Sequence, residues 1–132
     1  MTYLLDTNVC IKYLNASSEV VKRHIEKYEP SEIVICSVVK SELFAGAYKS
    51  KNKEKTLDKL KIFFAPLKSL TFNDKAAKAY GKIRAELEKK GTPIGPYDLQ
   101  IASIAIVNDL VLVSHNKREF SRVEGLKIED WE

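Results

Sequence analysis

Three short apolar runs, separated by stretches with helical spacing, constrain the fold of this chain more than any other feature. They cover residues 3–5, 33–35 and 110–113 and consist mainly of Leu, Ile and Val. Runs of this kind are typical of buried parallel strands, which helices cover on both faces. The alternation of strands and helices therefore predicts an α/β fold with a mostly parallel sheet.

Capping residues predict where several helices begin. Ser18 and Asn73 each precede a segment with apolar residues at helical spacing, which predicts that both cap a helix. Ser37 is predicted to cap the helix after the second strand, with Phe44 on its inner face. Pro96 suits the first position of a helix that is apolar nearly all round, so that helix is predicted to be buried.

The other predicted elements complete a single domain. Further helices are predicted over 9–14 and 52–64, the buried helix that Pro96 opens is predicted over 99–108, and further short strands are predicted over 67–70 and 127–128. The sequence contains no repeat and no linker-like tract, and 132 residues suit one domain over 1–132.

The cysteines and the N-terminus predict a cytoplasmic protein. Cys10 and Cys36 form no CxxC pair, and His24 and His115 lie at no zinc-ligand spacing from them, so both thiols are predicted to be buried and reduced. The N-terminus lacks a signal-peptide pattern, and no apolar run is long enough to span a membrane.

The positive charge of the chain leaves two interpretations open. The formal net charge is +4, and six lysines crowd the segment 49–61. Interspersed Glu54 and Asp58 favour a solvated helix face. The alternative is an electrostatic surface for RNA phosphates.

Acids from distant parts of the chain are predicted to meet at one edge of the sheet. Asp6 follows the first strand, Glu42 lies early in the helix after the second, and Asp98 lies in the first turn of the helix leading to the third. Ser114, Asn116 and Glu119 follow the third strand. Open α/β sheets bind ligands at this carboxyl edge. Each acid alone has a structural explanation, as a helix cap or as an exposed residue.

Carboxylates at close quarters repel one another unless a cation binds between them. Oxygen ligands select Mg²⁺ or Mn²⁺ rather than zinc. The constellation therefore predicts a divalent metal site.

At these residues the chain resembles the PIN-domain nucleases, and among them the VapC toxins of bacterial and archaeal toxin–antitoxin pairs. The matching stretches are YLLDTNVCIKYL at 3–14, SVVKSELFAGAYKS at 37–50, GTPIGPYDLQIASIA at 91–105 and VLVSHNKREFSRVEGLKIEDW at 111–131. They occur in the order typical of the family and cover nearly the whole chain. The resemblance implies a three-layer α/β/α sandwich and a Mg²⁺-dependent endoribonuclease, with Mn²⁺ able to substitute.

The resemblance also implies roles for individual residues. Asp6, Glu42 and Asp98 match the metal-binding acids of the family. Asn116 matches a catalytic position that is Asp in many members, and a neutral amide binds metal less strongly than a carboxylate. The matching positions expected to support the site are Thr7, Asn8, Ser114 and Glu119, of which Glu119 is a candidate to compensate for Asn116. The family usually has no histidine at the position of His115, which is interpreted as a rim residue.

The expected reaction is hydrolysis of RNA by a metal-activated water, giving 3′-hydroxyl and 5′-phosphate ends. Expected partners are a cognate antitoxin, a structured RNA with tRNA favoured, and a second copy of the chain, through apolar residues of the helices in 37–64. Arg84 and the lysines of 49–61 are candidates for RNA backbone contacts.

Four other functions were weighed against this one. A phosphoacceptor receiver domain needs adjacent acids after the first strand, and a haloacid dehalogenase-type phosphatase needs DxD there. The sequence DTN at 6–8 meets neither requirement. A non-catalytic PIN-like module that binds RNA or protein, and a nuclease that cleaves DNA, stay open.

Overall fold

The computed structural model describes residues 1–132 and contains a five-stranded sheet with the strand order β3-β2-β1-β4-β5. The strands are β1 (Tyr3–Leu5), β2 (Ile33–Cys36), β3 (Lys68–Leu70), β4 (Val111–Val113) and β5 (Lys127–Glu129). All four pairings are parallel, as predicted. The central strands β2, β1 and β4 are buried throughout, whereas the edge strands β3 and β5 contain no fully buried residue.

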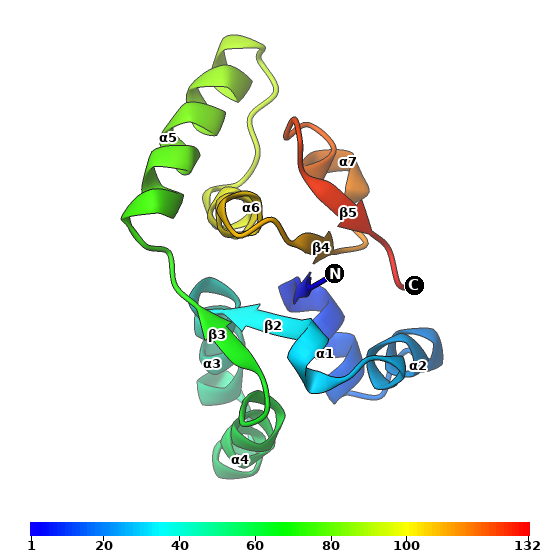
Figure 1. Cartoon of the computed structure of the whole chain (residues 1–132). Helices are drawn as coiled ribbons and strands as arrows, with labels where there is room; N and C mark the ends of the chain where they lie inside the picture. Colours follow the sequence, from blue (N-terminus) through cyan, green and yellow to red (C-terminus); the bar gives the residue numbers. More distant parts are fainter.

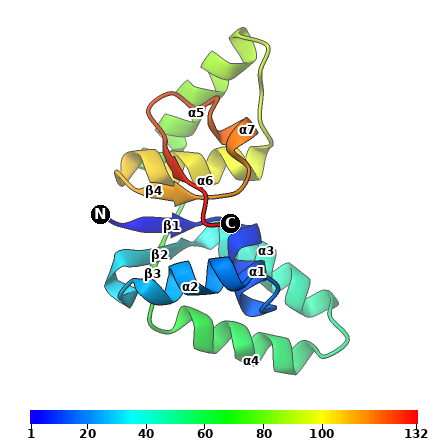
Figure 2. The ribbon, with the colours of Figure 1, turned by 90° about the vertical axis from the view of Figure 1, so that its right-hand side faces the viewer.

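Helices cover both faces of the sheet and form the predicted sandwich. They are α1 (Thr7–Leu14), α2 (Glu19–Lys27), α3 (Ser37–Lys49), α4 (Lys53–Phe64), α5 (Asp74–Lys89), α6 (Pro96–Val107) and α7 (Lys117–Phe120). Figure 1 shows their order around the sheet, and Figure 2 shows α5, α6 and α7 on one face with α1 to α4 on the other. None of these helices combines the length and the hydropathy needed to span a membrane.

Two predicted helix caps are confirmed. Ser18 Oγ accepts a hydrogen bond of 3.2 Å from the Val21 amide at the start of α2. Asn73 Oδ1 accepts one of 2.9 Å from the Ala76 amide at the start of α5. Such bonds satisfy amides that have no partner within the helix. The buried helix that starts at Pro96 is also confirmed, since its residues 101–105 are fully buried.

Other local predictions were wrong. Ser37 does not cap α3; its hydroxyl donates instead to the Leu70 carbonyl of the adjacent edge strand, at 3.3 Å. Phe44 is 37 % exposed, because the inner face of α3 is formed by Val39, Leu43 and Ala47. The short helix α7 was not predicted, since four residues are too few to show a helical period.

The C-terminal segment packs against α2 and β1 through aromatic side chains. The Trp131 ring stacks on His24, with centroids 5.4 Å apart, and on Tyr28, with centroids 5.2 Å apart. Tyr3 of β1 packs against the same ring, with the two ring centroids 5.2 Å apart. His24 is therefore a packing residue, which agrees with its position on an amphipathic helix. The two cysteines are buried and unbonded to each other, as predicted.

Candidate active site at the carboxyl edge of the sheet

Asp6 lies at the centre of the candidate site, immediately after β1. Its amide donates to the Val113 carbonyl of β4 at 3.0 Å, so the backbone at Asp6 continues the sheet by one residue. The carboxylate is 6 % exposed and accepts two hydrogen bonds of 2.8 Å, from the Thr7 amide and from the Ser114 hydroxyl. The first of these bonds caps α1, which therefore begins at Thr7, two residues earlier than predicted.

Glu42 reaches the same edge from the second turn of α3. Its Oε1 accepts a hydrogen bond of 2.9 Å from the Thr7 hydroxyl. Thr7 thus contacts both acids, because its amide holds Asp6 and its side chain holds Glu42. These two bonds provide a structural basis for the supporting role predicted for Thr7.

Asp98 and Glu119 complete a group of four carboxylates. Asp98 lies in the first turn of α6, and a hydrogen bond with the Glu119 carboxyl is one of the interactions that raise its pKa. Glu119 Oε2 also accepts a hydrogen bond of 2.9 Å from the Asn116 side-chain amide. Asn116 therefore orients the carboxylate of Glu119, and Ser114 Oγ in turn accepts a bond of 3.0 Å from the Asn116 backbone amide.

The pKa values of two of these acids are raised, which means that their surroundings disfavour the ionised carboxylate. Burial raises the pKa of Asp6, although the hydrogen bonds from Ser114 and Thr7 oppose that rise. Burial, followed by repulsion from Asp6, Glu119 and Glu42, raises the pKa of Asp98 to about 6. Desolvation and like charge both disfavour the ionised form, and a bound cation relieves both.

The supporting role of Asn8 stays a prediction. Its side chain is exposed and makes no hydrogen bond within the protein, although it is next to Thr7 in the sequence.

A second group of potential ligands lies at the rim. One ligand atom each from His115, Asp130 and Glu132 lies within 4.8 Å of the others, which is closer than any three of the edge acids approach. The group is an ion-pair cluster, since Lys12 contacts Glu132 and His115 Nδ1 lies 3.0 Å from Asp130 Oδ2. Sequence reasoning missed it, because nothing in the local pattern shows where the C-terminal segment runs.

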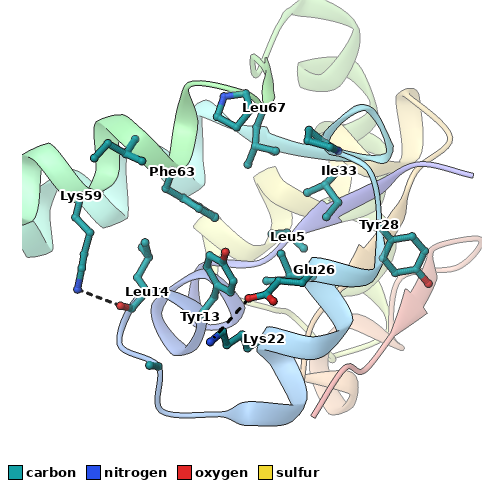
Figure 3. A pocket seen from close by; sticks show the side chains of 15 residues that line it. Leu5, Tyr13, Leu14, Lys22, Glu26, Tyr28, Ile33, Lys59, Phe63 and Leu67 are labelled. Atoms are coloured by element: carbon teal, nitrogen blue, oxygen red, sulfur yellow. Dashed lines mark hydrogen bonds and ion pairs between the residues drawn. The ribbon is translucent and has the colours of Figure 1, made fainter.

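An apolar groove of about 470 Å³ lies between α1, α2 and α4, and its lining contains none of the four acids. Figure 3 shows Tyr13 and Leu14 of α1 facing Phe63 of α4 across it, with Lys22 and Glu26 of α2 at one side. Lys59 Nζ donates to the Leu14 carbonyl at 3.2 Å and ties α4 to the end of α1. Ile62 on the same groove is 75 % exposed.

Comparison with known proteins identifies close relatives over the full length. A model of the PIN domain matches residues 3–126. Ribonuclease VapC2 from Rickettsia felis is 41 % identical over 133 residues, which cover 100 % of this chain and 99 % of that protein. The tRNA(fMet)-specific endonuclease VapC from Salmonella typhimurium is 40 % identical, over 99 % of this chain and 98 % of that protein.

Solved structures of two such relatives have the same fold. The crystal structure of VapBC2 from Rickettsia felis bound to a DNA fragment from its promoter aligns with a TM-score of 0.91 at 40 % identity, over 100 % of both chains. The crystal structure of DNA-bound VapBC from Salmonella typhimurium aligns with a TM-score of 0.92 at 40 % identity, over 99 % of this chain and 98 % of that one.

Proposed function

This chain belongs to the PIN domain family, and from that premise we propose that it is the ribonuclease toxin of a VapBC-type pair, dependent on Mg²⁺ and directed at tRNA. The observation that carries the proposal is the convergence of Asp6, Glu42, Asp98 and Glu119 at one edge of the sheet. The named relatives support ribonuclease activity and argue against a non-catalytic module.

The four carboxylates fit a divalent metal. They come from four different elements, offer only oxygen ligands and repel one another, as the raised pKa of Asp98 shows. Asp6, Glu42 and Asp98 would hold the ion, with Glu119 as the fourth acid in place of the neutral Asn116. When bound, Mg²⁺ or Mn²⁺ supplies charge neutralisation at the phosphate and Lewis-acid activation of water.

The protein's own contribution is to hold the acids in place. Ser114 and the Thr7 amide fix both oxygens of Asp6, the Thr7 hydroxyl fixes Glu42, and the Asn116 amide fixes Glu119. Outer partners of this kind typically change metal affinity or activity by about 10–100-fold when they are removed. Asn116 is therefore a positioning residue in this proposal rather than a metal ligand.

The exposed lysines of α3 and α4 suit an RNA backbone. In Figure 2, α3 runs outward from the carboxyl ends of the strands and α4 returns beneath the sheet, so the turn between them lies on the side of the acids. Lys49, Lys51 and Lys53 surround this turn and are exposed. Phosphate contacts of this kind provide affinity without sequence preference. We propose that the protein acts in the cytoplasm, where an RNA substrate of this kind is present.

The apolar groove between α1, α2 and α4 is the surface that we assign to the antitoxin. Its lining is mainly hydrophobic, and Ile62 in the lining is strongly exposed, as expected of a surface that a protein partner covers. VapC relatives are found in VapBC complexes. A homodimer through α3, where Phe44 and Tyr48 are exposed, stays a prediction.

The test is cleavage of purified tRNA and total bacterial RNA by the purified protein, with Mg²⁺ and with a chelator. Asp6→Asn and Asp98→Asn should each abolish cleavage without unfolding the protein, whereas Asp58→Asn on the exposed face of α4 should not change it. Products should carry 5′-phosphate and 3′-hydroxyl ends. Cleavage that survives the chelator, or 2′,3′-cyclic phosphate ends, would contradict the mechanism. A matched DNA substrate tests the remaining alternative.

A further inference from the structure

A small cavity lies between α5 and the loop that leads into α6, and its lining extends to the start of α6, which carries Asp98 in its first turn. Its volume is about 200 Å³. The polar side chains in its lining are Tyr80, Arg84 and Glu88 of α5, and its apolar walls include Ile94, Pro96 and Leu99. Pockets for drug-sized ligands span about 300–1,000 Å³, so this cavity suits a smaller, flat group.

The cavity is connected to the proposed active site through the backbone. Leu99 in its wall directly follows Asp98, and consecutive Cα atoms are about 3.8 Å apart. On the other side, Arg122 Nη1 donates to the Pro93 carbonyl at 2.9 Å and so ties the loop to the segment that follows α7. Glu119 lies on α7. Pro96 and Leu99 of the lining thus lie on either side of Asp98 in the first turn of α6, and the loop in the wall is hydrogen-bonded to the segment that follows Glu119.

The polar pair in the lining offers donors and acceptors side by side. Arg84 Nε donates to Glu88 Oε2 at 3.0 Å. A guanidinium has five N–H donors, so most of them stay free, and the second oxygen of Glu88 stays free as an acceptor. The carboxylate of Glu88 disfavours a phosphate at this position, whereas the edge of a nucleobase carries both donors and acceptors.

We propose that this cavity binds one nucleobase of the substrate RNA, next to the phosphodiester that is cut, and gives the enzyme a base preference at that position. The inference rests on the proposed ribonuclease activity. The apolar walls contact the faces of the base, and the Arg84–Glu88 pair reads its edge. The exposed lysines contribute affinity, and the cavity contributes selectivity.

The first test uses an RNA pool with a randomised segment and sequencing of the 5′ ends of the products. The wild-type protein should prefer one base, or one pair of bases, at a fixed position near the cut. Glu88→Gln and Arg84→Gln should reduce that preference by about tenfold while cutting the pool with the same end chemistry. Glu86→Gln and Lys82→Gln, on the same helix but outside the lining of the cavity, should keep it.

Two results of the pool experiment would overturn the inference. One is a preference in Glu88→Gln and Arg84→Gln that equals that of the wild type. The other is an equal loss in the Glu86→Gln and Lys82→Gln controls, which would indicate an effect of net charge and not of the cavity.

The second test does not depend on activity. Adenosine, guanosine, cytidine and uridine are titrated separately into the metal-free protein, and the amide signals of Ile94 and Leu99 are followed by NMR. At least one nucleoside should shift both signals, and Glu88→Gln should remove the shift. The inference would be overturned if no nucleoside shifts the two amide signals, or if inorganic phosphate shifts them and the nucleosides do not. Nucleoside shifts in a protein that cleaves no RNA would overturn the proposed function and leave the cavity assignment standing.

Discussion

The hydroxyl of Thr7 donates a 2.9 Å hydrogen bond to Oε1 of Glu42 and joins the start of α1 to α3 across 35 residues of sequence. Thr7 is 9 % exposed, so this bond is largely shielded from water. It is the only hydrogen bond that fixes the Glu42 side chain, and the metal site should therefore depend on it.

Replacing Thr7 by Val removes this donor and keeps the shape of the side chain. Glu42 then loses its fixed orientation, and we expect affinity for Mn²⁺ to fall by about tenfold or more. The measurement is a Mn²⁺ titration by calorimetry on the metal-free protein, together with the metal dependence of cleavage. Thr7→Ser keeps the hydroxyl and should bind Mn²⁺ like the wild type. Equal affinities for the Val and Ser variants would show that the bond does not position Glu42.

Asp98→Asn should stabilise the metal-free protein at neutral pH. The pKa of Asp98 is raised to about 6 in the folded state, against about 3.9 for an unperturbed Asp. A raised pKa means that the folded state favours the neutral acid, so stability falls as pH rises through this window and is lowest above it.

The Asn variant should lack that fall between about pH 4 and pH 6. Because Asp98 is only partly buried, the gain at neutral pH should be on the order of 1 kcal/mol, or roughly 4 °C in Tm. Thermal melts in the presence of a chelator measure it. Added Mg²⁺ should stabilise the wild type more than the variant. A variant that is less stable than the wild type in chelator at neutral pH would argue against repulsion at this site.

Ser114→Ala should destabilise the fold through Asp6. Ser114 is fully buried and donates to Asp6 Oδ2 at 2.8 Å. Without it a buried carboxylate oxygen has no partner, which costs about 1–3 kcal/mol. The bond lowers the pKa of Asp6, so its loss should raise that pKa further, and the destabilisation should be larger at neutral pH than at about pH 5. Urea unfolding at both pH values measures this, with the exposed Ser121→Ala as control. Equal losses at the two pH values would mean that Ser114 does not act through Asp6.

Trp131→Leu tests how much the aromatic packing of the C-terminal segment contributes to the stability of the fold. The ring packs against His24 and Tyr28, and its Nε1 donates to Glu129 Oε1 at 3.0 Å. Loss of these contacts should cost about 3 kcal/mol. Far-UV circular dichroism in urea is the readout, and Tyr97→Leu, which alters a side chain that is 60 % exposed, is the control. A loss no greater than that of the control would show that the stack contributes little.

The order of the main elements could be predicted from the sequence, and so could the position of the acids at one edge of the sheet. Apolar runs mark β1, β2 and β4, and the caps at Ser18 and Asn73 mark two helix starts. Parallel topology alone then brings the segments that carry Asp6, Glu42 and Asp98 to one edge, whatever the details of packing.

The details of the site could not be predicted, because they depend on side-chain orientation. Thr7 and Asn8 are neighbours, yet only Thr7 reaches the acids. Nothing in the pattern at 114–119 shows that the Asn116 amide would face Glu119. Ser37 has the residue type of a cap, but a free carbonyl on β3 competes for its hydroxyl. In each case tertiary packing decides between local alternatives of similar free energy.

The borders of the sheet limit how this protein can assemble. Both β3 and β5 are three residues long, and each carries an exposed lysine, Lys68 on one and Lys127 on the other. Short, charged border strands discourage a foreign strand from pairing with them. Antitoxin, RNA and any second copy are therefore expected to bind helices and loops rather than to extend the sheet.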